Sequence, residues 1–223
     1  MSSFASRALE TIQVQSHDKW VTPDFPRIEK VVDFIRQRRL SPGRLLDVGY
    51  CSGSFADYLR PVGWKCTGLD ICLRTNAPIP VVAGNVTEGL PFKSDSFKLV
   101  VGGELIEHLI DQKSFLVECY RILVPGGLLV LTTPNLTYSL NRLLVLIGRE
   151  PLFVTAPYHF HFHTRRSLFN LLQDAGFNVL RITASHVLYS RRRHPSGKLF
   201  EWLADCFPTW GAHLIAFAIK KIP

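Results

Sequence analysis

The sequence predicts an α/β fold in which a seven-stranded, mostly parallel sheet carries helices on both faces. Short apolar segments with strand character alternate with segments of helical periodicity through most of the chain. The chain has 223 residues, 47% of them hydrophobic, which suffices for one α/β domain with its own core. Parallel strands joined by crossover helices are the simplest arrangement for such an alternation.

In the first half of the chain, an irregular arm and a helix are expected within residues 1–40. Pro26 suits the first turn of that helix, apolar residues follow at helical spacing, and Ser41-Pro42-Gly43 ends it. A short apolar strand then leads into a Gly/Ser turn and a second helix, and two more apolar strands follow. The expected elements are helices at 26–39 and 54–63 and strands at 44–49, 65–71 and 79–83.

The second half continues the alternation but ends differently. The last two strands are separated only by a short helix, so they are expected to pair antiparallel at one edge of the sheet. An apolar, helix-like insertion interrupts the pattern after the fifth strand. The expected elements are strands at 97–102, 128–134, 177–185 and 213–221, helices at 111–123, 165–175 and 198–207, a loop or helical turn at 104–109, and the insertion helix at 136–148.

Charge and cysteine content narrow the classes of function. The net charge is +8, which attracts nucleic acid, an anionic membrane or acidic small molecules, or serves only solubility. The five cysteines are odd in number and form no CxxC pair, which favours free thiols over a zinc site. We see no signal peptide and no apolar run of about 18 residues, so we expect a cytoplasmic protein.

Candidate cofactor-binding residues follow the first three strands, because ligands of open parallel sheets bind beyond the carboxyl ends of the strands. Gly49 and Gly53 follow the first strand and let the backbone approach a ligand closely. Asp70 follows the second strand and can accept both hydroxyls of a ribose. Asn85 follows the third and can bond an adenine edge. The glycine spacing misses the dinucleotide pattern G-x-G-x-x-G, which argues against a pyrophosphate-containing ligand.

Four segments, taken in order, resemble class I S-adenosylmethionine-dependent methyltransferases. They are LLDVGYCSGSF, LPFKSDSFKLVVGGELIEHL, RILVPGGLLVLTTPN and LLQDAGFNVL, and the resemblance covers roughly residues 44–185. It implies a Rossmann-like fold whose seven-stranded, mostly parallel sheet has an antiparallel edge strand. It also implies a single methyltransferase domain over 1–223, with an arm and helix at 1–40 and a substrate-covering insertion at 136–160.

The resemblance also implies S-adenosylmethionine as the cofactor and assigns residues to it. The implied cofactor-binding residues are Asp47, Gly49, Tyr50, Cys51, Gly53 and Glu104 around the methionine end, Asp70 at the ribose, and Ile71, Asn85 and Val86 at the adenine. Three positions depart from the family pattern. Cys51 stands where glycine is frequent, and Asn85 and Lys98 stand where aspartate is common. These departures put single contacts in doubt and leave the site as a whole intact.

Two histidine-rich segments are candidates for catalysis. Glu104, Glu107 and His108 share one face if their segment is helical, and the three histidines of 159–163 point to one side if that segment is extended. Transfer to an oxygen needs a base or a divalent metal to deal with the acceptor's proton. We therefore take His159 and His108 as candidate catalytic residues. A metal site built from the two glutamates and His108 with His159 or His161 stays an alternative, as does a merely hydrogen-bonded, buried His108.

Two subfamilies sharpen the resemblance. Ubiquinone-biosynthesis O-methyltransferases carry a similar, metal-assisted E-x-x-E-H. Small-RNA 3′-terminal 2′-O-methyltransferases carry E-x-x-E-H, then T-P-N, then a histidine before Thr-Arg, and here 133–135 and His159 before Thr164-Arg165 follow that order. The same E-x-x-E-H string is also widespread in methyltransferases that use no metal.

The resulting prediction is methylation, at oxygen, of a small-molecule or lipid-like acceptor. The insertion 136–160 is strongly apolar, which suits a hydrophobic acceptor, a lid, a dimer contact or a plain core helix. Arg191, Arg192 and Arg193 beside the amphipathic stretch 198–203 suggest peripheral contact with an anionic membrane, or else a solvated loop and a packed helix. An RNA 2′-O-methyltransferase and a non-catalytic, cofactor-binding partner subunit are the alternative functions.

Overall fold

A computed structural model describes residues 25–50, 55–71, 77–156, 158–187 and 195–222. Several predictions of the sequence fall outside these residues and are not addressed by the structure. They concern the arm at 1–24, the cofactor-binding residues Cys51 and Gly53, and the basic stretch Arg191, Arg192 and Arg193.

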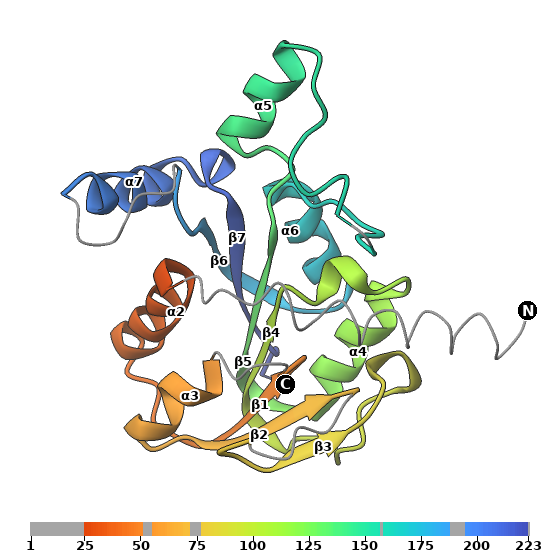
Figure 1. Cartoon of the computed structure of the whole chain (residues 1–223). Coiled ribbons are helices and arrows are strands. Elements are labelled where there is room, and N and C mark those ends of the chain that lie inside the picture. The colour runs from red at the N-terminus through yellow and green to blue at the C-terminus, as the bar shows by residue number, and fades with distance from the viewer. Residues whose placement is uncertain (1–24, 51–54, 72–76, 157, 188–194, 223) are drawn as a thin grey trace, which may run out of the picture.

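One seven-stranded sheet in the order β3-β2-β1-β4-β5-β7-β6 forms the centre of the molecule (Figure 1). Neighbours from β3 to β5 are parallel, and β7 runs antiparallel to both β5 and β6. The strands are β1 Arg44–Val48, β2 Lys65–Asp70, β3 Val81–Ala83, β4 Phe97–Gly103, β5 Leu123–Pro134, β6 Asn178–Ala184 and β7 His213–Ile219. The predicted fold class and the antiparallel pair are confirmed, and the reversed strand β7 lies just inside the edge strand β6.

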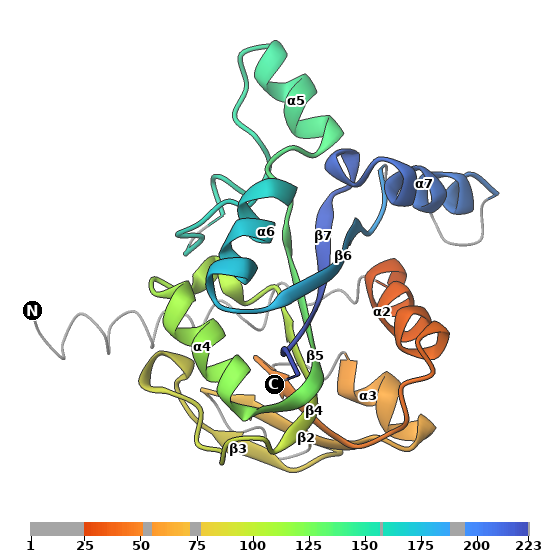
Figure 2. The ribbon, with the colours of Figure 1, turned by 180° about the vertical axis from the view of Figure 1, so that it is seen from behind.

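Helices cover both faces of the sheet, as the two opposite views show (Figures 1 and 2). The α-helices are α2 Phe25–Gln37, α3 Phe55–Leu59, α4 Gln112–Ile122, α5 Ser139–Leu146, α6 Arg165–Asp174 and α7 Pro195–Cys206. Short 3-10 turns are η1 Arg60–Val62, η2 Val86–Glu88, η3 Ile106–His108 and η4 Pro208–Trp210. Helices α2 and α3 lie on one face and α4 and α6 on the other, while α5 stands away from the sheet.

The core forms on both faces because apolar side chains of the central strands alternate between them. Leu46 and Val100 pack with the buried residues of α4 and α6. Leu45 and Leu99, their neighbours along the same strands, pack with α2 and α3. This two-sided burial fixes the strand register, since a slip of one residue would exchange the two sets.

Several elements differ from the prediction in extent. The helix expected at 54–63 divides into α3 and η1, because Pro61 falls in the turn and Gly63 ends it in the left-handed region. The segment 104–109 contains the short turn η3, in agreement with the loop or helical turn expected there. Helix α5 is not a packed core helix, since Asn141 is its only buried residue. Among the described residues, no helix is long and apolar enough to cross a membrane.

Candidate functional site

The predicted ribose and adenine residues meet at the carboxyl edge of β2 and β3. Asp70 ends β2 opposite Ala83 of β3, and its carbonyl accepts the Gly84 N–H at 2.9 Å. The Asn85 side chain accepts the Thr87 N–H at 3.0 Å and so begins η2. The structure therefore brings Asp70, Ile71, Asn85 and Val86 to the same edge.

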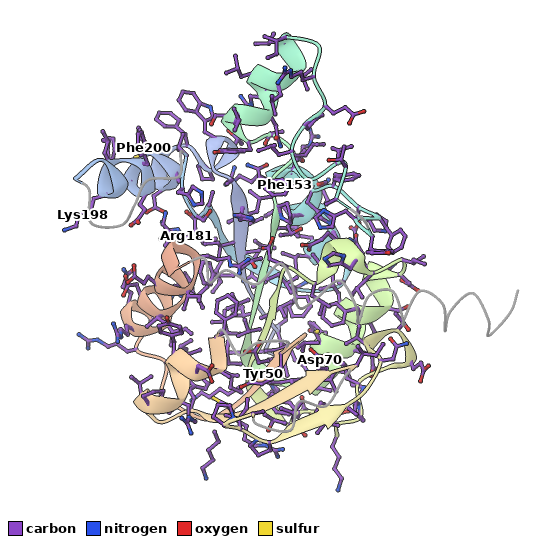
Figure 3. All side chains as sticks on the ribbon, in the orientation of Figure 1. Tyr50, Asp70, Phe153, Arg181, Lys198 and Phe200 are labelled. Carbon is purple, nitrogen blue, oxygen red and sulfur yellow. The ribbon has the colours of Figure 1, made fainter. Side chains whose placement is uncertain are left out.

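The turn after β1 lies directly beside this edge. Gly49 adopts a φ of 73°, and the N–H groups of Gly49 and Tyr50 both donate to the Leu69 carbonyl of β2. The Tyr50 side chain, labelled in Figure 3, is buried. A Cβ atom on Gly68 would approach the Tyr50 side chain to 2.8 Å, so this glycine makes room for the tyrosine.

Asp47 is the buried acid of the turn. It is 2% exposed, and one of its oxygens accepts the Ala56 N–H at 2.9 Å at the start of α3. Burial raises the pKa of Asp47 to about 7, and this effect outweighs the Ala56 N–H, which favours the ionised form. Asp47 therefore supports the turn through a buried hydrogen bond rather than through a surface charge.

Glu104 follows β4 and turns back over the sheet. Its φ of 50° lies in the left-handed region, which is unusual for a residue other than glycine. Its carboxylate accepts the Thr132 hydroxyl at 2.9 Å and pairs with Arg27 at 2.6 Å and with His213 Nε2 at 3.6 Å. Burial raises the pKa of Glu104, but the nearby His213 and Arg27 outweigh this and lower it, so the carboxylate is ionised.

Arg27 and His213 were not identified from the sequence. Arg27 lies in the first turn of α2, is 9% exposed, and stacks 5.9 Å from the centre of the Phe55 ring. The sequence could have indicated that Arg27 faces the protein, because it stands one helical turn before Val31, which is buried. His213 begins β7, where the sequence indicated only strand character. Its ring lies 5.6 Å from that of Phe153, so β7 also contributes a side chain to this site.

A second group gathers where η3 meets the segment before α6. Glu107, His108 and His159 each place a potential ligand atom within 4.8 Å of the others. The rings of His108 and His159 meet edge to face at 4.7 Å, and His108 Nδ1 lies 3.0 Å from the Tyr158 carbonyl oxygen. Among the described residues, no hydrogen-bond partner is found for the buried carboxylate oxygens of Glu107 or for His159 Nδ1. We call these three residues the histidine cluster.

The larger cluster considered from the sequence does not form. Glu104 does not share a face with Glu107 and His108, because its left-handed φ precedes the short turn η3 and no continuous helix joins them. His163 is buried and lies 2.9 Å from the Gln112 amide nitrogen, and His161 Nε2 lies 3.3 Å from the Ile110 carbonyl. The three histidines of 159–163 therefore contact different residues and do not act as one group.

Comparison with known proteins identifies the domain. The sequence profile of a family described as a methyltransferase domain matches residues 22–182, which is well over half of the chain. The chain belongs to this methyltransferase family. The predicted fold is confirmed by the solved structures that the chain matches, and the predicted dependence on S-adenosylmethionine agrees with the family and with a relative described as S-adenosylmethionine-dependent.

The methyltransferase matches relatives of several kinds. A probable S-adenosylmethionine-dependent methyltransferase of Mycolicibacterium smegmatis is 35% identical over 143 residues, covering 60% of this chain and 52% of the relative. The chain thus spans about half the length of that relative. The mitochondrial ubiquinone biosynthesis O-methyltransferase of Rattus norvegicus is 25% identical over 245 residues, covering 94% of this chain and 69% of the relative.

Solved structures show the same fold. The 1,6-didemethyltoxoflavin-N1-methyltransferase of Burkholderia thailandensis, with bound 1,6-didemethyltoxoflavin and S-adenosylhomocysteine, matches with a TM-score of 0.68 at 16% identity. The match covers 99% of this chain and 91% of that chain. At 16% identity this similarity shows the fold and does not assign roles to residues.

The described residues of the methyltransferase fit the cofactor chemically. Asp70 and Asn85 supply the acceptors and donors that a ribose and an adenine edge require. Arg27 and Glu104 offer one positive and one negative group, which complement the carboxylate and ammonium of the methionine end. The Nε atom of Arg27 is buried and has no hydrogen-bond partner among the described residues, so its guanidinium keeps bonding capacity.

Burial shifts the pKa values of Glu107 and His159 in the histidine cluster. Burial, and then the nearby Glu104, raise the pKa of Glu107 well above the ordinary range. Burial lowers the pKa of His159, so its imidazole is neutral near neutral pH. A neutral imidazole beside a buried carboxyl group can accept a proton or bind a cation, and these are the two chemical uses of this cluster.

Proposed function

We propose that this methyltransferase transfers the methyl group of S-adenosylmethionine to an oxygen atom of a small-molecule or lipid-like acceptor. The histidine cluster carries this proposal, because methylation at oxygen requires removal of a proton and His159 places an imidazole, kept neutral by its burial, beside Glu107 and His108. The O-methyltransferase of Rattus norvegicus, which matches almost the whole chain, supports the choice of oxygen.

The chain's residues divide the work between binding and proton removal. The bound cofactor supplies an electrophilic methyl group. Asp70 and Asn85 hold its nucleoside, and Arg27 and Glu104 hold its amino-acid end. As the acceptor's oxygen forms its bond to the methyl carbon, the sulfur–carbon bond breaks with its electron pair on sulfur. The acceptor's O–H bond breaks as well, and His159 takes that proton.

A second candidate function is 2′-O-methylation of RNA with a divalent cation. The grouping of Glu107, His108 and His159 favours it, because mixed carboxylate and imidazole ligands suit several divalent metals. In that case the cation, not His159, would lower the pKa of the acceptor hydroxyl. The net charge of +8 would assist contacts with phosphates.

One experiment separates these possibilities. A radiolabelled methyl group from S-adenosylmethionine is transferred into cell extract, which is then fractionated into lipid, small-molecule, RNA and protein pools. We expect label in the lipid or small-molecule pool, resistance to chelation, and a loss of roughly a hundredfold or more with His159→Ala. His161→Ala is the matched control from the same segment and should keep the activity within about threefold.

The other outcomes are informative too. Equal activity of His159→Ala and the wild type would remove His159 from the mechanism. Label in the RNA pool that disappears on chelation would establish the second candidate. Binding of S-adenosylhomocysteine without label in any pool would indicate a non-catalytic subunit that binds the cofactor.

A further inference from the structure

Exposed apolar side chains are concentrated in one stretch of this molecule. Nine of the large apolar residues that are exposed in the described structure lie between residues 143 and 169. On helix α5 itself, Leu146 is 83% exposed, Ile147 62% and Leu143 54%. Isolated exposed leucines are ordinary, but a group of this kind marks a contact surface. We call Leu143, Leu146 and Ile147 the α5 surface.

Helix α5 is held only at its base. The Asn141 amide donates to the carbonyls of Asn135 and Leu136, and its oxygen accepts the Leu152 N–H at 2.8 Å. The Arg142 guanidinium reaches the Thr137 carbonyl at 2.8 Å. From this base α5 projects beyond the end of β5, well away from the sheet in both views (Figures 1 and 2). Its apolar side chains therefore face outward on a firmly anchored element.

The charges around α5 indicate what it contacts. Between residues 139 and 170 the chain has four arginines and a single acidic residue, Glu150. Arg142 and Arg149 flank the α5 surface, and Arg165 and Arg166 are exposed at the start of α6. Apolar side chains bordered by arginines match an anionic lipid surface, where the tails accept the former and the head groups attract the latter.

Helix α7 and the turn η4 also expose side chains that suit a lipid surface. Trp202 is 59% exposed and Trp210 42%, and tryptophan prefers the boundary between lipid head groups and tails. The Arg142 guanidinium also reaches the Thr209 carbonyl of η4 at 3.4 Å, which joins the base of α5 to η4. Lys198 adds a further cation on α7 (Figure 3).

We propose that the α5 surface docks the methyltransferase on an anionic lipid bilayer. Leu143, Leu146 and Ile147 insert among the lipid tails, and the flanking arginines lie at the head groups. The eight residues of α5 are too few to span the bilayer, so the helix lies at its surface. This inference goes beyond the proposed function and does not depend on it, since docking is independent of the acceptor's identity.

The test is sedimentation of the full chain with lipid vesicles. Vesicles of equal parts phosphatidylcholine and phosphatidylglycerol should bind the wild type, and vesicles of phosphatidylcholine alone should bind it at least about tenfold more weakly. Leu146→Glu should reduce binding to the anionic vesicles by about tenfold or more. Val117→Glu is the matched control, because Val117 is 50% exposed on α4, far from α5, and its substitution should leave binding unchanged.

Three results would overturn the proposal. The wild type fails to bind anionic vesicles, or Leu146→Glu and Val117→Glu bind them equally well, or Leu146→Glu converts a dimeric wild type into monomers and vesicles bind neither. The last result would assign the α5 surface to a second copy of the chain. Binding of S-adenosylhomocysteine, measured on the same samples, reports on the cofactor site separately and should be the same for all variants.

Discussion

At the scale of single residues, the pair formed by Arg27 and Glu104 links the start of α2 to the end of β4. Two opposite charges at 2.6 Å neutralise one another. A ligand carrying both an ammonium and a carboxylate can exchange partners with such a pair without leaving a charge uncompensated. Under the proposed function, the pair is therefore suited to the amino-acid end of the cofactor.

Removal of Arg27 should discriminate between ligands with and without an amino-acid group. We expect Arg27→Met to weaken S-adenosylhomocysteine by about 10- to 100-fold, because hydrogen bonds to charged groups contribute about 1.5–3 kcal/mol. Binding of 5′-methylthioadenosine, which lacks that group, should change less than about twofold. Titration calorimetry measures both. Arg36→Met, an exposed position of the same helix, is the control, and an equal loss for both ligands would mean that Arg27 acts only through folding.

Asp47 should make the stability of the apoprotein depend on pH. Its pKa is about 7 in the folded protein against an ordinary 3.8, so between these values only the unfolded state has lost the proton. The free energy of unfolding therefore falls as the pH rises through this range and levels off above about pH 7. Asp47→Asn cannot ionise and keeps an oxygen for the Ala56 N–H.

We thus expect Asp47→Asn to exceed the wild type in stability by about 2–4 kcal/mol at about pH 8, since one pKa unit corresponds to about 1.4 kcal/mol. The difference should shrink to about 0.5 kcal/mol near pH 4, where Asp47 is protonated in the folded state and only about half ionised in the unfolded state. Urea denaturation at the two pH values tests this. A difference that is the same at both would show that Asp47 does not titrate in this range.

The residues of the site were predictable only in part. The common edge of Asp70 and Asn85 was predictable because the two residues stand at or just beyond the ends of β2 and β3, and the ends of parallel strands meet at one edge. The pairing of Glu104 with Arg27 and His213, outside the histidine cluster, was not, because the backbone at Glu104 takes a left-handed φ that no periodicity indicates. His213 was missed because its neighbours Glu104 and Phe153 are distant in sequence and are brought together only by the pairing of β7 with β5.

At the scale of elements, the start of α6 has a capping box directly after the segment that carries His159. The Thr164 hydroxyl accepts the Ser167 N–H at 3.1 Å, and the Ser167 hydroxyl accepts the Thr164 N–H at 2.9 Å. Each bond satisfies an N–H group that the helix itself cannot pair. The cap therefore fixes the point at which the histidine segment ends.

Loss of this cap should be measurable without loss of the fold. We expect Thr164→Ala to lower the free energy of unfolding by about 1 kcal/mol, which is the usual contribution of an N-cap. Thr164→Ser retains the hydroxyl and should remain within about 0.5 kcal/mol of the wild type. Denaturant unfolding of both variants provides the comparison, and equal destabilisation would show that the methyl group rather than the cap matters.

Element boundaries followed from the sequence less well than element types. Alternating strands and helices predicted the sheet because apolar runs and helical periodicity are local signals. The end of α3 was misplaced because Pro61 is compatible with the first turn of a helix, and here it lies in the separate turn η1. For α5, an apolar composition was compatible with both a core helix and an exposed one, and only the tertiary structure decides between them.

At the scale of the whole molecule, the net charge of +8 should produce weak, sequence-independent binding to polyanions. We expect single-stranded RNA to bind at low salt and binding to fall by at least about tenfold between about 50 and 200 mM salt, because contacts with phosphates release counterions. Fluorescence anisotropy with two unrelated RNA sequences measures this. Tight binding that persists at high salt and distinguishes the sequences would instead support the RNA methyltransferase.

The position of β7 has a consequence for synthesis on the ribosome. This strand follows the other six in the chain, yet it lies between β5 and β6. Until it emerges, β5 presents an open edge and β6 has no neighbour in the sheet. Until then the backbone groups of β5 and β6 that pair with β7 have no partner, and strands of different chains can pair with them instead. We therefore expect the chain to be most prone to aggregation before β7 is available to complete the sheet.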